Sequence, residues 1–126
     1  MSIPKTDSDQ RHVRAARALG SLGSHRSEHQ RLGIQCRRAH HLAAVYETGD
    51  GLVYESRTGP HGHGSKDFID TGRRGSRGGD EYVDLLLAGP GAADELPAWC
   101  ACGPRTLSRA EVLGHLRAGV RSVRLD

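Results

Sequence analysis

Metal-binding residue types are confined to two short segments of this chain, and this constrains its fold more than any other feature. The first segment is Cys36-Arg37-Arg38-Ala39-His40-His41, and the second, far downstream, is Trp99-Cys100-Ala101-Cys102-Gly103. Together they contain all 3 cysteines of the chain. Three thiolates and one imidazole complete the tetrahedral shell of a structural zinc ion. The pattern therefore predicts a Zn²⁺ ion that joins two remote parts of the chain.

The spacing within each segment suits a tight turn that carries two ligands. We expect the zinc ligands to be Cys36, His40, Cys100 and Cys102. Gly103 follows the second pair, where the chain must turn without a Cβ clash. The alternative to a metal site is a set of buried free thiols beside a surface histidine pair.

Several histidines are candidates for the fourth ligand position. His40 is favoured over His41 because the chain from Leu42 onward must enter a strand and needs one residue after the ligand to turn. His61 and His63 are further alternatives for the same position.

A thin hydrophobic core also favours a metal. Only 36% of the 126 residues are hydrophobic, and the aromatic residues are 1 Trp, 1 Phe and 3 Tyr. The 17 glycines add backbone entropy that folding must overcome. Small domains with so little to bury often depend on a metal or on cross-links.

The chain divides by composition into two parts. Residues 1–30 lack Phe, Tyr and Trp and carry several positive charges, so we expect them to form a flexible basic N-terminal arm. A short helix after Asp9 would stop at Gly20 and Gly23. Residues 31–126 are expected to form the zinc-binding domain.

Local patterns within the second part predict an α+β fold. The Asp-Gly dipeptide at 50–51 between two apolar runs predicts a β-hairpin. Ser108 and Glu111 form a capping box that predicts a C-terminal helix ending at Gly119. The expected elements are strands at 32–36, 42–47, 52–56, 96–100 and 120–125, a strand or short helix at 81–87, and a helix at 109–118. The result is a small zinc-stapled antiparallel β-sheet, that is, one cross-linked by the metal, with one C-terminal helix.

The segment from Thr58 to Asp80 is a long loop rich in Gly, His and Arg. His61-Gly62-His63 with two nearby aspartates could supply half of a metal-dependent hydrolase site, although ordinary exposed histidines are the simpler interpretation. Residues 72–79 resemble an Arg-Gly-rich phosphate-binding loop, with a solvated linker as the alternative. Cys36 beside His40 or His41 could also form a nucleophile–base pair, which would explain only one of the cysteines. We therefore expect no enzymatic activity.

The two Cys-containing segments and Leu42-Ala43-Ala44-Val45-Tyr46 resemble small zinc-ribbon-like proteins of unknown function from GC-rich, actinobacterial-type bacteria. The Cys-x-Cys pair departs from the usual Cys-x-x-Cys of such ribbons. The resemblance implies a structural metal in a small β-rich domain, and it implies no particular activity because such ribbons bind nucleic acids and proteins alike.

The charge of the chain and its lack of long apolar segments limit the classes of function to be considered. The net charge is +3, and nearly all the positive charge is carried by arginine, which binds phosphate through its planar guanidinium. We expect a zinc module that contacts DNA, RNA or a protein of the gene-expression machinery, with a pure protein-interaction or assembly factor as the alternative. No apolar signal segment or membrane-length run is present, so we expect a cytoplasmic protein in which thiols stay reduced.

Overall fold

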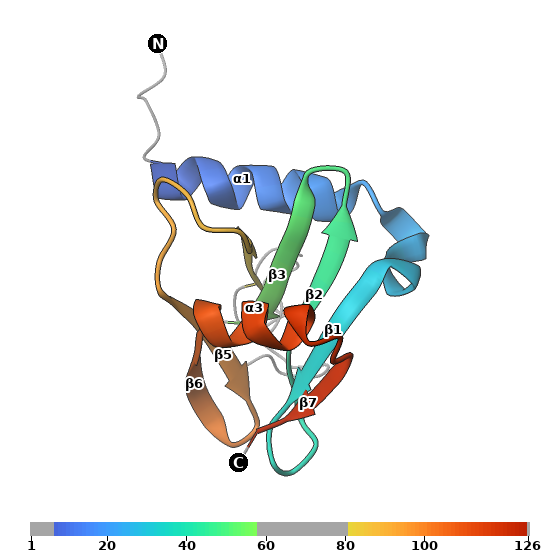
Figure 1. Cartoon of the computed structure of the whole chain (residues 1–126), viewed down its shortest axis with the longest axis vertical. Helices are drawn as coiled ribbons and strands as arrows, with labels where there is room; N and C mark the ends of the chain where they lie inside the picture. The colour runs from blue at the N-terminus through green and yellow to red at the C-terminus, as the bar shows by residue number, and fades with distance from the viewer. Residues whose placement is uncertain (1–6, 58–80, 126) are drawn as a thin grey trace, which may run out of the picture.

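The computed structural model describes residues 7–57 and 81–125, which form an α+β fold (Figure 1). The predicted fold class is confirmed. None of the helices in these residues is long and apolar enough to cross a membrane. In chain order the elements are α1 (Asp7–Gly20), the 3-10 helix η1 (Gly23–His29), β1 (Gln30–Gln35), β2 (His41–Thr48), β3 (Gly51–Arg57), β4 (Glu81–Leu85), β5 (Glu95–Cys100), β6 (Gly103–Ser108), α3 (Arg109–Arg117) and β7 (Ser122–Arg124).

The strands form two sheets of different size. Five strands make a mixed sheet in the order β4-β3-β2-β1-β7, and β5 pairs with β6 in a separate two-stranded sheet. The prediction of a purely antiparallel sheet is wrong at one edge, because β7 pairs with β1 in parallel. The reason is the connection: α3 carries the chain back before β7 begins, and parallel neighbours need such a crossover.

The hairpin predicted around the Asp-Gly dipeptide is present as β2 and β3. Its register runs from Ala43 opposite Ser56 to Thr48 opposite Gly51. Gly51 has a φ of 103°, which side-chain-bearing residues rarely adopt. Thr48 Oγ1 donates to Gly51 O at 2.8 Å and accepts from the amide of Asp50 at 3.1 Å, so the turn is closed by its own side chain.

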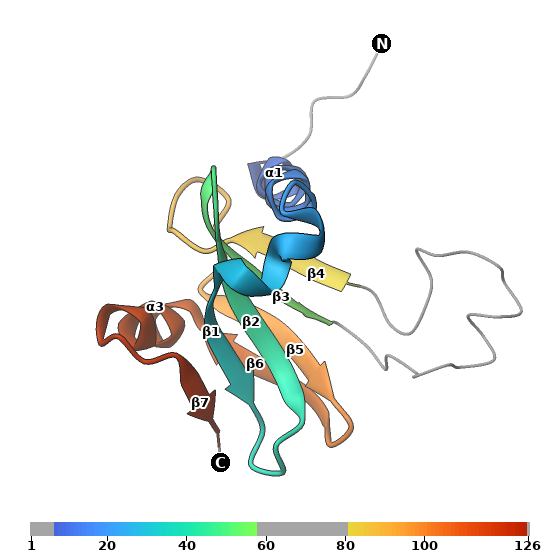
Figure 2. The same ribbon diagram turned by 90° about the vertical axis from the view of Figure 1, so that its right-hand side faces the viewer.

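Strand β2 is buried on both faces and separates two hydrophobic clusters. Ala43 and Val45 point to the larger cluster, which contains residues of β5, β6 and α3. Ala44 and Tyr46 point to the smaller cluster, which contains residues of α1 and β4. This division follows from the two-residue period of a strand. Figure 2 shows the result, with α1 and α3 on opposite sides of the large sheet.

The β5–β6 hairpin is fixed on the large sheet by two hydroxyl groups of β3. Tyr54 Oη and Ser56 Oγ both donate to Pro97 O, at 2.9 Å and 2.5 Å. Tyr54 is fully buried, so its hydroxyl needs this partner.

The predicted C-terminal helix follows β6 directly. Ser108 caps α3 by accepting a hydrogen bond from the amide of Glu111 at 3.3 Å. Val112 is buried against the larger cluster, and the chain turns at Gly119, where φ is 78°. The capping pattern and the glycine stop therefore predicted the bounds of this helix within a residue.

The expected flexible arm over residues 1–30 is wrong for the part of it that the structure describes. Helix α1 packs on β4 and buries Ala15, Ala18 and Leu19, which are 0%, 5% and 2% exposed. Because alanine side chains are small, the helix can pack closely on the sheet, and its buried face needs no aromatic residue. The segment is therefore part of the core, and the folded unit begins before residue 31.

A buried charge network ties α1 to the rest of the fold. Asp84 in β4 accepts from Arg11 Nε at 3.2 Å and from Arg109 Nη2 at 2.9 Å. Both arginines also donate to Leu85 O, at 2.6 Å and 2.8 Å, and all three charged residues are at most 8% exposed. Because buried charges are tolerated only when they are paired and hydrogen-bonded, the network requires α1, β4 and α3 to be assembled together.

Asp84→Asn should destabilise the fold strongly, because it leaves two buried guanidinium groups without a counter-charge. We expect the free energy of unfolding to fall by about 3–5 kcal/mol in urea titrations. Glu47→Gln is the matched control, since it breaks only the exposed pair between Arg31 and Glu47 and should cost less than about 1 kcal/mol. Equal losses in the two variants would contradict the role given to the buried network.

Candidate metal centre

The first ligand turn connects β1 to β2 and is shaped by its own backbone. The amide of Cys36 donates to His40 O at 2.9 Å, and the amide of Ala39 donates to Cys36 O at 2.8 Å. Ala39 has a φ of 67°, the one positive φ of a non-glycine residue in the described part of the chain. The amide of Arg38 lies 3.3 Å from Cys36 Sγ, so a backbone donor faces the sulfur.

The second ligand turn closes the β5–β6 hairpin. Cys100 and Gly103 are the last opposed pair of the ladder, so Ala101 and Cys102 form the two-residue turn between them. Gly103 has a φ of 118°, as expected for a position that must turn without a Cβ. The amide of Cys102 donates to Cys100 Sγ at 3.4 Å, which repeats the amide-to-sulfur contact of the first turn.

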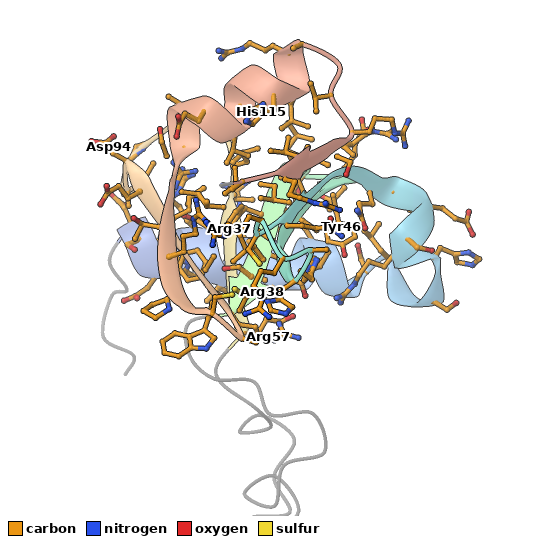
Figure 3. The ribbon with its side chains drawn as sticks, turned by 90° about the horizontal axis from the view of Figure 1, so that it is seen from below. Arg37, Arg38, Tyr46, Arg57, Asp94 and His115 are labelled. Carbon is orange, nitrogen blue, oxygen red and sulfur yellow. The ribbon has the colours of Figure 1, made fainter. Side chains whose placement is uncertain are left out.

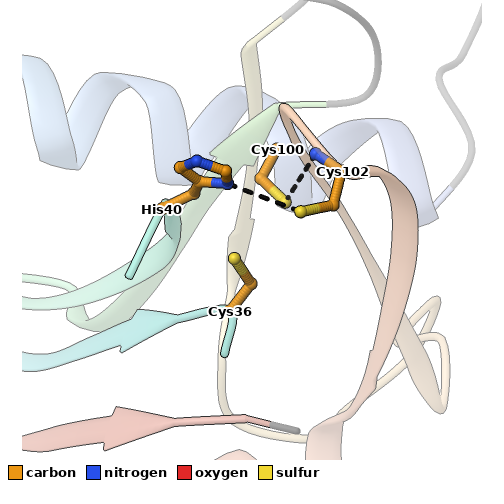
Figure 4. Close-up of side chains that lie close together, drawn as sticks. All are labelled: Cys36, His40, Cys100 and Cys102. Carbon is orange, nitrogen blue, oxygen red and sulfur yellow. Dashed lines mark hydrogen bonds between the residues drawn. The ribbon is translucent and has the colours of Figure 1, made fainter. Parts of the chain in front are cut away.

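The two turns bring all four predicted ligands together (Figure 4). One donor atom from each of Cys36, His40, Cys100 and Cys102 lies within 4.8 Å of all the others. Cys102 Sγ and His40 Nδ1 are 3.6 Å apart. Bond lengths of about 2.3 Å to sulfur and about 2.0–2.1 Å to nitrogen put two ligands of one tetrahedral zinc ion about 3.6 Å apart. The cluster therefore has the composition and the dimensions to bind a metal ion.

The three thiols differ in exposure and in acidity. Cys36 and Cys100 are 2% and 3% exposed, whereas Cys102 is exposed. Burial opposes ionisation of Cys36, but hydrogen bonds from the backbone at His40 and Arg38 and from the other two thiols outweigh it and lower its pKa to about 6. Although Cys102 is exposed as a residue, partial removal of its sulfur from water and the sulfurs of Cys36 and Cys100 raise its pKa. One thiolate is thus stabilised before any metal arrives, and thiolates are the form that binds metals.

A pocket of about 350 Å³ opens beside the cluster. It is lined by His40, His41, Glu55, Ser56, Arg57, Cys100 and Ala101. Glu55 is 7% exposed and forms an ion pair with Arg26 at 3.1 Å. Burial, together with the nearby carboxylate of Glu81, raises the pKa of Glu55 to about 7. This side chain was missed by the sequence analysis because glutamate in a strand usually faces water, and only its position in the two-residue alternation of β3 could have indicated burial.

The other histidine alternatives fare differently. His41 is exposed and lines the pocket, but it does not belong to the four-residue cluster. His61 and His63, with the hydrolase site they would build, lie outside the described residues, as does the Arg-Gly-rich loop at 72–79. Trp99, which precedes Cys100 in β5, is half-buried.

No known protein family, curated protein or solved structure matches this chain. The resemblance to zinc-ribbon-like proteins therefore stays a prediction from the residues themselves.

The two adjacent histidines should behave differently on substitution. His40→Ala removes a donor from the cluster and should weaken metal binding by about 100-fold or more in a competition titration with a chromophoric chelator. His41→Ala should leave the metal affinity within about threefold of the unmodified chain, because its imidazole lies outside the cluster. The reverse order of effects would assign the fourth ligand to His41.

The raised pKa of Glu55 predicts a pH-dependent contribution to stability. Its pKa of about 7 in the fold exceeds the ordinary 4.5, so the folded state binds more protons between these values and this contribution is lost as pH rises through them. Compared with Glu55→Gln, the unmodified chain should lose on the order of 1–3 kcal/mol of unfolding free energy between about pH 5 and about pH 8.

The comparison with Glu55→Gln is needed because protonation of metal ligands also changes stability at low pH. That effect is common to both proteins and cancels in the difference of their unfolding free energies. A difference that stays constant with pH would show that Glu55 has an ordinary pKa in the fold.

Proposed function

We propose that this chain is a small zinc-binding module in which the metal has a structural role, and that the module contacts nucleic acid. The observation that carries the proposal is the convergence of four soft donors from two turns that are far apart in sequence. Thiolate-rich tetrahedral sites select zinc over harder cations such as Mg²⁺ and Ca²⁺. The donor distances support a single ion.

The structural role follows from the number of protein ligands. Catalytic zinc sites keep one position open for water or substrate, whereas structural sites have four protein ligands. Three cysteines and one histidine fill all four positions here, so the proposal assigns no enzymatic activity to the metal. The ion would link the β1–β2 turn of the large sheet to the β5–β6 turn of the small one.

Cellular location and partner belong to the same proposal. Reduced thiols need a reducing compartment, which favours the cytoplasm. The net charge of +3 and the predominance of arginine favour a polyanionic partner, that is, DNA or RNA in the gene-expression machinery. If the chain shows no salt-dependent binding to DNA or RNA, the alternative is a protein-interaction factor that does not bind nucleic acid.

Zinc dependence can be tested at Cys102, because this thiol is exposed and contributes little packing. We expect elemental analysis to find about one zinc per chain. Cys102→Ser should lower the free energy of unfolding by on the order of 3 kcal/mol in the presence of zinc, through about 100-fold weaker metal binding. With a strong chelator present, the same substitution should change stability by less than about 0.5 kcal/mol.

The chelator arm is the control for a packing effect of the substitution. A Cys102→Ser variant that loses the same stability with and without zinc would contradict the structural role of the metal. Iron or copper in the purified chain in place of zinc would overturn the choice of ion.

A further inference from the structure

Four arginines gather around the candidate metal centre at one end of the molecule. Arg37 and Arg38 belong to the first ligand turn, and Arg57 lines the pocket beside the cluster. Arg124 in β7 is opposite Gln35, the residue before Cys36. Figure 3 shows this end of the molecule, where Arg37, Arg38 and Arg57 are labelled. We call these four residues the basic rim.

Most of the basic rim has no counter-charge among the described residues. Arg37, Arg38 and Arg124 are exposed and form no side-chain ion pair or hydrogen bond with another described residue. Arg57 is shared between Glu55 at 3.8 Å and Glu81 at 3.7 Å, and its side chain is 36% exposed. Neither ligand turn contains a carboxylate. The rim therefore presents positive charge to any partner at this end.

Compensation of the metal site does not account for all of this charge. One Zn²⁺ ion with three thiolates leaves a single net negative charge, and one guanidinium is enough to offset it. The three unpaired arginines exceed that requirement. Arginine in such a position suits phosphate, because its planar fork binds two oxygen atoms at once.

The pocket inside the rim distinguishes between forms of nucleic acid. Its volume of about 350 Å³ lies within the range for small-molecule sites, and its wall includes the polar side chains of His41 and Arg57. Bases of a duplex are stacked and cannot enter such a pocket, whereas unstacked bases of a single strand can. The combination of pocket and rim therefore favours a single strand.

We propose that the basic rim binds the sugar–phosphate backbone of a single-stranded nucleic acid and that one unstacked base enters the pocket. This inference rests on the proposed function and deepens it by naming the surface and the form of the partner. Contacts with phosphate carry no sequence information, so binding at this surface is expected to be insensitive to base sequence.

The test compares two double substitutions in the full, zinc-loaded chain. Arg37→Gln/Arg38→Gln removes two rim charges. Arg14→Gln/Arg17→Gln removes two exposed charges of α1 that form no ion pair within residues 7–57 and 81–125, at the opposite end of the molecule (Figure 1). The probe is a fluorescently labelled single strand of about 12 nucleotides, titrated by anisotropy from about 50 to about 200 mM salt.

The unmodified chain should bind with a log–log salt slope of about −3, since four phosphate contacts contribute about 0.7 each on a single strand. The rim variant should lose about tenfold in affinity at the lowest salt, and its slope should be smaller by about 1.4. The α1 variant should stay within about twofold of the unmodified chain. A matched duplex should bind more weakly than the single strand.

Several results would overturn the proposal that the basic rim binds a single strand. These are equal losses in both variants, tighter binding of the duplex, equal binding to anionic phospholipid vesicles, or no salt-dependent binding by the unmodified chain. Loss of zinc from the rim variant would show instead that the arginines serve only the metal site. Zinc content is measured on every sample. A purified chain without zinc would contradict the proposed metal site, whereas a zinc-loaded chain with equal losses in both variants would contradict only the proposed role of the rim.

Discussion

Two hydroxyl groups of β3 hold the β5–β6 hairpin against the large sheet, and the candidate metal centre depends on that contact. Tyr54 and Ser56 both donate to Pro97 O, three residues before Cys100. Because strand geometry determines where the following residues lie, this contact brings the β5–β6 turn level with the turn that begins at Cys36. The donor atoms thus converge through contacts of the polypeptide itself, which lowers the ordering that a metal must impose.

Local chemistry made part of this structure predictable. The hairpin, the capped helix and the two tight turns that carry the Cys/His cluster each depend on a few neighbouring residues, such as the Asp-Gly turn or the spacing of Cys100 and Cys102. Strand β6 was not predicted, because it begins with Gly103 and Pro104, which are poor strand residues, and its pairing is imposed by the tight turn before it. The pocket could not be predicted either, since its walls come from strands that only the tertiary fold brings together.

The packing of α1 on the sheet shows why other parts of the fold could not be predicted from the sequence. Its buried face is built from Ala15, Ala18 and Leu19, a stripe too small to stand out by hydropathy in an arginine-rich segment. The buried Arg11 finds its partner, Asp84, far along the chain. Whether an arginine faces water or a buried carboxylate is decided by a long-range contact that a single sequence does not reveal.

Exposure is uneven around the candidate metal centre, and this determines which donor atom a chelator would reach first. Cys36 and Cys100 are buried, whereas Cys102 is exposed and His40 is half-buried at the wall of the pocket. With a metal bound, a chelator or a competing thiol would meet the Cys102 sulfur before the two buried sulfurs. Cys102 is therefore the donor at which exchange of a bound ion would begin.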